Sequence, residues 1–413
     1  MAFNCCCDWS SKLPDELTVE ILCRLPEKPL IQFKSVSKAW YFLISDVCVP
    51  RISSSAPLSG FLFRLIPLIP FSDYRMEYVP SDCRRTLRDR GRFVESYSKL
   101  LPFQPTGRDV LDCCNGLVLI LHRSSVPPSS VPSQYYVCNP ATKQCVAIPV
   151  NPNHLDPIYA VLAFNPVEPP PNNTNNNNYK IVRLASSAST ASVTHPPELD
   201  VFSSVTGKWV NHPVPLQPEP KLYGFKGICK SVYLDGVLYM LSYTKYLLCF
   251  DLNADNLNPR AVKLPNKGKA LGVGFIGMSK DCFYYSNHVE NAILVWSLDH
   301  DHQWILKHSI CIDDLVQFHH GRILDRYRLS PLLVPCALHP TSEVIFIAIP
   351  RMIFSYNLKT NQFNVFYMLQ EYRNLIDDGC FFFPYSRCLV VLNDFTQMND
   401  IPRNKGLEVG VTI

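Results

Sequence analysis

A strand–turn–strand unit recurs along this 413-residue chain and constrains its fold more than any other feature. In each copy an apolar or aromatic strand ends in a polar turn, and a further apolar or aromatic residue opens the next strand. The first and last positions lie seven residues apart in four copies, which are 138–145, 202–209, 297–304 and 356–363. A more divergent copy lies at 250–262. These hairpins predict a set of repeated antiparallel sheets.

The spacing of the hairpins favours a β-propeller. Propeller repeats have a period of roughly 40–50 residues, and such a repeat forms one four-stranded blade that cannot bury its faces alone. We predict five blades from the sequence, at 107–149, 158–213, 231–265, 271–309 and 333–368. Strands at 58–79 and 380–393 would form a sixth blade from both ends of the domain, which would remove open sheet edges. A pair of β-sandwiches is the structural alternative.

The composition agrees with a large β domain. Hydrophobic residues make up 47% of the chain, which is enough for a sizeable core, and the 12% aromatic content favours strands. The formal net charge is only +4, without the dense basic stripe that nucleic-acid binding usually requires. We therefore expect no nucleic-acid partner.

The 17 cysteines do not indicate a secreted disulfide scaffold. Their number is odd, the chain is long, and many lie in apolar strand-like runs, where cysteine behaves as a small buried hydrophobe. The first residues turn polar early instead of forming a signal peptide. The longest apolar runs, such as 343–349 and 379–385, are far shorter than the ~20 residues of a membrane helix. We expect a soluble protein with no membrane partner, in the reducing cytoplasm, the nucleus or both.

The stretch 13–45 has the pattern of three short amphipathic helices. Pro14 suits a first helical turn, whereas Pro26 ends the first helix and Pro29 can open the second. Ser35 or Ser37 can cap the third helix. Three such helices bury little surface, so their many apolar side chains indicate a protein partner.

This stretch closely resembles an F-box. The matching pieces are LPDEL at 13–17, ILCRLP at 21–26, Leu30 with Phe33, VSKAW at 36–40, and LI at 43–44. The resemblance implies docking onto the Skp-type adaptor of an SCF ubiquitin ligase and, through the adaptor, onto cullin. The adaptor contacts that it implies are Leu13, Pro14, Leu17, Ile21, Leu22, Leu25, Pro26, Leu30, Phe33, Val36, Trp40, Leu43 and Ile44. Of these, Trp40, Leu43 and Ile44 can serve the core of the helical bundle, the interface or both.

The remainder resembles the F-box-associated, kelch-like propellers of plant F-box proteins, although the double glycine of true kelch repeats is missing. The phrases that carry this resemblance include VLDCCNGL at 110–117, LDVFSSVTGKW at 199–209 and HPTSEVIF at 339–346. The predicted organisation is a disordered tail at 1–11, an F-box at 12–46, a linker at 47–57, a propeller at 58–400 and a tail at 401–413. The expected fold class is thus a small all-α F-box of three helices followed by an all-β, six-bladed propeller.

No convincing catalytic or metal site emerges from the sequence, and we expect no cofactor. The histidines at 300, 302, 308, 319 and 320 are dense, but no cysteine pair has the usual spacing of zinc ligands. Cys5, Cys6 and Cys7 fit an unstructured tail better than an acylation or metal site. The basic cluster RRTLRDRGR at 84–92 is read as a solvated segment, with nuclear import or an acidic partner as alternatives. The low-complexity stretches 125–134 and 168–178 are expected to form loops on the blades.

The two resemblances imply a non-catalytic substrate receptor of an SCF ubiquitin ligase, whose propeller binds a protein target that the sequence does not identify. An alternative is a propeller that binds a small ligand or glycan outside target degradation. A glycosidase-like enzyme would need paired carboxylates, and only Asp313–Asp314 and Asp377–Asp378 are adjacent near blade ends. Sequence neighbours in a strand point to opposite faces, so this pattern does not favour an enzyme.

Overall fold

The structure is a computed structural model of the chain. The residues that it describes are 13–67, 75–81, 101, 103, 105–106, 109–122, 133–152, 157–168, 178–185, 198–213, 230–241, 246–265, 274–312, 333–349, 352–368, 373–374 and 382–392.

The first described segment, 13–54, is a helical region. Its elements are α1 (Asp15–Cys23), α2 (Glu27–Phe33), α3 (Lys38–Phe42), the π-helix η1 (Leu43–Cys48) and α4 (Val49–Ser54). The N-cap of α1 is Pro14, whose missing N–H would have no partner inside the helix. The hydroxyl of Ser37 caps α3 by accepting a hydrogen bond from the backbone N–H of Trp40 at 3.2 Å. The prediction of a small all-α region is therefore confirmed.

The third helical segment is longer than the sequence suggested. We predicted a linker at 47–57, but α3, η1 and α4 follow one another directly as far as Ser54. Pro50 lies in the first turn of α4 and lacks an N–H. The wider π-helical turn of η1 stands directly before it, which keeps the chain helical through a residue that normally interrupts a helix.

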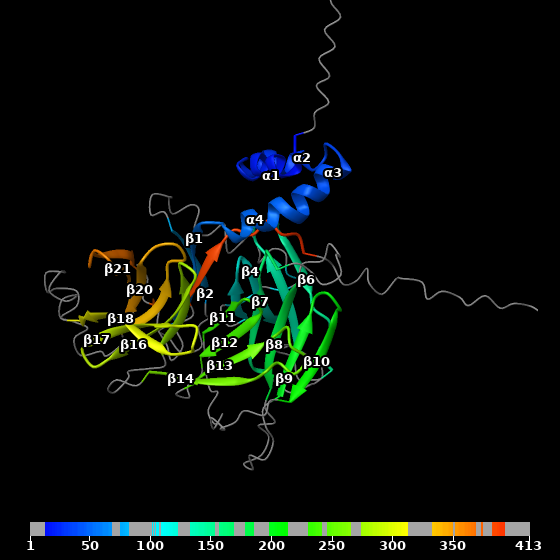
Figure 1. Cartoon of the computed structure of the whole chain (residues 1–413). Coiled ribbons are helices and arrows are strands. Elements are labelled where there is room, and N and C mark those ends of the chain that lie inside the picture. The colour runs from blue at the N-terminus through cyan, green and yellow to red at the C-terminus, as the bar shows by residue number, and fades with distance from the viewer. Residues whose placement is uncertain are drawn as a thin grey trace, which may run out of the picture.

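Five blades each consist of four consecutive antiparallel strands (Figure 1). The first blade comprises β3 (Val110–Cys114), β4 (Leu117–His122), β5 (Gln134–Asn139) and β6 (Gln144–Ala147). The second comprises β7 (Pro157–Phe164), β8 (Tyr179–Ala185), β9 (Glu198–Ser203) and β10 (Lys208–Pro213). The third comprises β11 (Ser231–Leu234), β12 (Val237–Leu241), β13 (Tyr246–Asp251) and β14 (Arg260–Lys263). The fourth comprises β15 (Phe275–Ser279), β16 (Cys282–Val289), β17 (Ala292–Leu298) and β18 (Trp304–Cys311). The fifth comprises β19 (Val334–Leu338), β20 (Val344–Ile349), β21 (Met352–Asn357) and β22 (Phe363–Met368).

The sixth blade joins the two ends of the domain, as predicted. Strand β1 (Leu58–Pro67) pairs with β2 (Arg75–Pro80) on one side and with β24 (Phe382–Ser386) on the other. The short strand β23 (Arg373–Asn374) pairs with the far end of β1. The innermost strands β3, β7, β11, β15, β19 and β24 contact one another in that order around a closed ring. The six-bladed propeller is thereby confirmed, and the two-sandwich alternative is wrong.

The recurring hairpin unit is the connection between the third and fourth strands of a blade. Its first and last residues face each other across the hairpin in three copies, as Cys138 with Cys145, Phe202 with Trp209, and Tyr356 with Phe363. The rings of Phe202 and Trp209 lie 5.4 Å apart, and those of Tyr356 and Phe363 lie 6.4 Å apart. Tilted ring packing of this kind stabilises a hairpin end, which explains the recurrence of aromatic residues at these positions.

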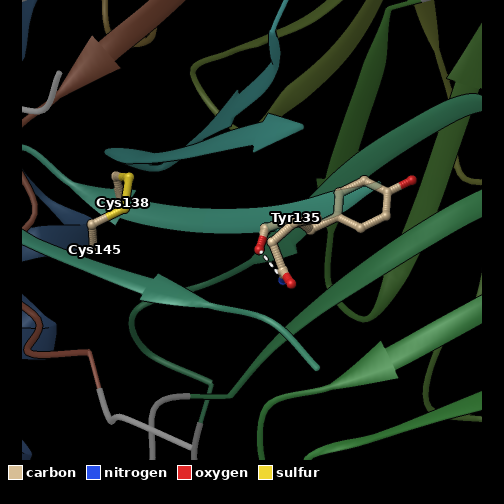
Figure 2. The surroundings of a disulfide bond; sticks show 4 residues. Tyr135, Cys138 and Cys145 are labelled. Carbon is tan, nitrogen blue, oxygen red and sulfur yellow. Dashed lines mark hydrogen bonds between the residues drawn. A yellow bond between two sulfur atoms is a disulfide. The ribbon is translucent and has the colours of Figure 1, made fainter. Parts of the chain in front are cut away.

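In the first blade, the two facing residues of this hairpin are joined by a covalent bond and not by ring packing. Cys138 and Cys145 form a disulfide that joins β5 to β6 (Figure 2). The nine other cysteines in the described ranges are free thiols. The expectation of free cysteines is thus wrong for this pair, because the hairpin register brings together two cysteines that lie seven residues apart in the sequence.

A buried carboxylate connects three of the innermost strands. Asp112 of β3 accepts hydrogen bonds from the backbone N–H of Leu162 in β7 at 2.9 Å and from the hydroxyl of Ser231 in β11 at 3.4 Å. It also accepts one from the backbone N–H of Cys113 at 2.8 Å. Burial nevertheless raises the pKa of Asp112 to about 6, although these hydrogen bonds and the nearby Lys230 ammonium oppose the shift.

This carboxylate should make the stability of the propeller depend on pH. Because the pKa of an aspartate in an unfolded chain is about 3.9, the folded state binds the proton of Asp112 more tightly. The stabilisation that protonated Asp112 contributes to the folded state is fully present below about pH 4 and is lost as the pH rises through about 6. We expect the free energy of unfolding, wild type minus Asp112→Asn, to fall by about 1–2 kcal/mol between about pH 4.5 and about pH 7.5. Urea unfolding of the wild type and of Asp112→Asn across this pH range measures the difference. A difference in the free energy of unfolding that does not change with pH would show that Asp112 does not titrate in this range.

Candidate functional site

Helix α1 has a buried face and an exposed apolar face. Val19 and Leu22 are buried in the core, with 8% and 2% of their surface exposed. Leu17 and Ile21 are each 54% exposed, and they stand one helical turn apart on the same side of the helix. Leu13, just before the helix, is 53% exposed. The exposed row is therefore available to a partner while the helix is held by its other face.

Further exposed apolar side chains lie in α2 and in the turn before α3. Ile31, Phe33 and Val36 are exposed. The ring of Phe33 packs edge-to-face against that of Trp40, with centroids 5.7 Å apart. Apolar side chains that remain this exposed in a row are a usual sign of a protein interface.

The structure divides the predicted adaptor contacts into three groups. Leu13, Pro14, Leu17, Ile21, Pro26, Phe33 and Val36 are exposed. Leu25, Trp40 and Leu43 are half-buried and pack against the core of the helical region. Leu22, Leu30 and Ile44 are buried within that core, so they support the helices from inside and do not form the surface.

Four further exposed apolar side chains were missed by the sequence analysis, namely Ile31, Tyr41, Phe42 and Val47. The helical pattern of the sequence places Ile31, Tyr41 and Phe42 on helices but does not show which face of each helix the rest of the molecule covers. Val47 fell in the predicted linker at 47–57. We call the exposed residues Leu13, Leu17, Ile21, Ile31, Phe33, Val36, Tyr41, Phe42 and Val47 the apolar helical surface.

The helical region is fixed to the propeller rather than tethered loosely. Cys48 and Val49 share one apolar cluster with Cys388, Leu389 and the strands of the first blade. The backbone N–H of Leu389 donates a hydrogen bond to the hydroxyl of Ser53 at 3.1 Å. Figure 1 shows α4 as the helix nearest the propeller, with α1, α2 and α3 beyond it. The apolar helical surface is thus presented in a defined orientation.

Charges at the side of the helical region connect its first and last helices. The carboxylate of Glu20 in α1 lies 2.9 Å from the guanidinium of Arg24 and 3.1 Å from that of Arg51 in α4. The hydrogen bond from Arg24 and the charge of Arg51 hold the pKa of Glu20 below its usual value. Burial lowers the pKa of Lys34 and raises that of Asp46, while their mutual attraction opposes both shifts.

The described residues contain no group of three or more His, Cys, Asp or Glu side chains that could hold a metal ion. His302, one of the dense histidines, has its Nε2 3.1 Å from a guanidinium nitrogen of Arg260. His319, His320, Asp313, Asp314, Asp377 and Asp378 lie outside the described residues, as do Cys5 to Cys7, the arginine cluster at 84–92 and most of the stretches 125–134 and 168–178. Within the described ranges, none of the helices combines the length and apolar character needed to cross a membrane.

Comparison with known proteins matches both parts of the chain. A family model described as "F-box protein At3g26010-like, beta-propeller" matches residues 88–405, and an F-box domain model matches residues 10–51. "F-box protein At5g07610" of Arabidopsis thaliana is 25% identical over 389 residues, which cover 88% of this chain and 87% of the relative. "F-box protein At5g49610" of the same plant is 32% identical over 151 residues, which cover 33% of this chain and 32% of the relative.

Among solved structures, the "Crystal structure of Nidogen/Laminin Complex" aligns with a TM-score of 0.39 and 9% identity, covering 76% of this chain and 93% of the other. The strand pairing of this chain and the family model both show the β-propeller fold.

Proposed function

This chain belongs to the family of F-box proteins with an At3g26010-like β-propeller, and from that premise we propose that it is the substrate-recognition subunit of an SCF-type ubiquitin ligase. Its F-box would bind a Skp-type adaptor and thereby cullin, and its propeller would bind the target. The observation that carries the proposal is the apolar helical surface, which lies on the F-box, while Cys48, Val49 and Ser53 hold the helical region on the propeller.

The physical basis for adaptor binding is the burial of this apolar surface. Exposed Leu, Ile, Phe and Tyr side chains on short helices are the type of anchor that fills a groove of a partner, and a few of them carry most of the affinity. The internal residues Leu22, Leu30 and Ile44 would hold the anchors in place without contacting the adaptor.

The propeller would supply specificity, and the complex would act by proximity. In this proposal no residue of the chain forms a covalent bond with the target. Holding the target beside the ubiquitin-charged conjugating enzyme raises the effective concentration of its lysines at the reactive thioester. The site of action would be the cytoplasm, the nucleus or both.

Reconstitution of the complex tests this function. The purified full-length chain is mixed with a Skp-type adaptor and a cullin, and the mass of the product is measured by light scattering during size-exclusion chromatography. We expect one complex with a single copy of each protein, and cullin should join only when the adaptor is present. A chain that elutes alone at micromolar concentration would contradict the proposal and leave the propeller as an independent binding domain.

A further inference from the structure

The helical region rests on a short segment that follows the last strand of the propeller. Residues 388–392, which we call the seat, contact it through the Leu389 N–H to Ser53 hydrogen bond and through the shared apolar cluster. Ser53 is 7% exposed and Leu389 is 7% exposed, so this contact is closed to solvent. Any movement of the seat would therefore move or release the F-box.

The seat is held on its other side by one turn of the first blade. The side-chain amide of Asn139 donates hydrogen bonds to the backbone carbonyls of Cys388 at 3.0 Å and Val390 at 2.7 Å. The Gln144 side chain accepts a hydrogen bond from the backbone N–H of Leu392 at 3.0 Å. Asn139 has no exposed surface. Two side chains of a single turn thus fix the path of the seat.

The Cys138–Cys145 disulfide closes this turn directly behind those two side chains. Asn139 pairs with Gln144, and the next pair outward is Cys138 with Cys145. The equivalent positions of the second and fifth blades are stabilised by aromatic rings, Phe202 with Trp209 and Tyr356 with Phe363. Among the described residues, the turn between Asn139 and Gln144 is therefore the one that a disulfide closes, so its closure depends on the oxidation state of Cys138 and Cys145.

We propose that Cys138 and Cys145 form a redox-dependent brace that holds the seat, and with it the F-box, in a fixed orientation on the propeller. With the disulfide formed, Asn139 and Gln144 are kept together and the seat is clamped. With the disulfide reduced, the turn opens more often and the clamp loosens. The consequence for target presentation rests on the proposed ligase function, whereas the brace itself does not.

The oxidant fits the chemistry of the pair. Cys145 is half-buried and Cys138 has no exposed surface, so a peroxide reaches Cys145 first. The Cys145 thiolate attacks one oxygen of hydrogen peroxide, the O–O bond breaks, and sulfenic acid and hydroxide form. The Cys138 thiol then attacks the sulfenic sulfur, the S–S bond forms and one water leaves. In reverse, two thiols of a glutathione-type reductant restore both cysteines and are oxidised to their own disulfide.

Hydrogen exchange on the full-length chain tests the brace without the adaptor. The chain is treated with hydrogen peroxide or with dithiothreitol, and alkylation with mass spectrometry confirms the state of the pair. We expect the backbone amides of residues 139–144 and 388–392 to exchange about tenfold or more faster in the reduced chain, because the open turn is no longer cross-linked. Strands β16 and β17 of the fourth blade should exchange equally in both states.

Two variants separate the brace from general effects of oxidation. Replacing both cysteines, Cys138→Ala with Cys145→Ala, should give fast exchange of the seat under either treatment. Cys336→Ala makes the same change at a buried free cysteine of the fifth blade and should behave like the wild type. The inference is overturned if peroxide leaves Cys138 and Cys145 as thiols, or if the seat exchanges at the same rate in both states. Neither result would bear on adaptor binding.

Discussion

Replacing Leu17 and Ile21 together by glutamine is expected to weaken the binding of a Skp-type adaptor by roughly 100- to 1000-fold. Both side chains are 54% exposed and lie on the same face of α1. Truncating a central apolar anchor of an interface commonly costs about 2 kcal/mol or more, so the loss of two gives an effect of this size. Glutamine is nearly as good a helix former as leucine, and the buried face of α1 is untouched.

Calorimetric titrations of the adaptor with the wild type and with the double variant measure this loss of affinity. Val210→Gln on β10 is the matched control, because Val210 is 52% exposed and lies on the propeller. The control should bind like the wild type, and all three proteins should unfold at the same urea concentration. Equal affinity of the double variant and the wild type would show that the exposed face of α1 is not the docking surface.

The largest loss of stability is expected from Asp200→Ala. Asp200 of β9 lies between Arg183 of β8 and Asn211 of β10 in the register of the second blade. Its carboxylate is 3.9 Å from the Arg183 guanidinium and accepts hydrogen bonds from the side-chain amides of Asn151 at 3.0 Å and Asn211 at 2.8 Å. Both members of the ion pair are almost fully buried, with exposed side-chain fractions of 4% and 2%.

Removing the carboxylate leaves the Arg183 charge buried without its anionic partner. We expect the free energy of unfolding to fall by about 3–5 kcal/mol, as measured by urea denaturation. The double change Arg183→Met with Asp200→Leu removes both charges and should recover most of this loss, because a buried ion pair is often replaceable by apolar side chains of similar size. If Asp200→Ala alone unfolds like the wild type, the pair does not contribute to the stability of the second blade.

The propeller was predictable because its hairpins are repeated in the sequence. Aromatic residues seven positions apart, Phe202 with Trp209 and Tyr356 with Phe363, mark the same turn in the second and fifth blades. Once that turn is located, the number of blades follows from the spacing, and the strands left at each end complete the sixth. Cys138 and Cys145 occupy the first and last positions of the same seven-residue unit. Their disulfide could be predicted only with the register of the hairpin, which places the two residues opposite each other.

The helical region was predictable in its helices but not in its surfaces. Prolines and a serine cap set the helix ends, whereas most of the linker predicted at 47–57 is helical, as far as Ser54. The spacing of apolar residues sorts them onto faces, yet it does not show that Leu22, Leu30 and Ile44 are internal while Tyr41 and Phe42 are exposed. That division depends on contacts such as Ser53 with Leu389, which are 336 residues apart in the sequence.

Binding of a Skp-type adaptor to the apolar helical surface is tested by a calorimetric titration of the purified adaptor into the full-length chain at several temperatures. We expect one binding site, a dissociation constant well below about 1 μM, and a negative change in heat capacity from the burial of the apolar helical surface. The absence of binding heat at every temperature, with tens of micromolar protein that is folded by circular dichroism, would contradict the assignment of this surface to the adaptor.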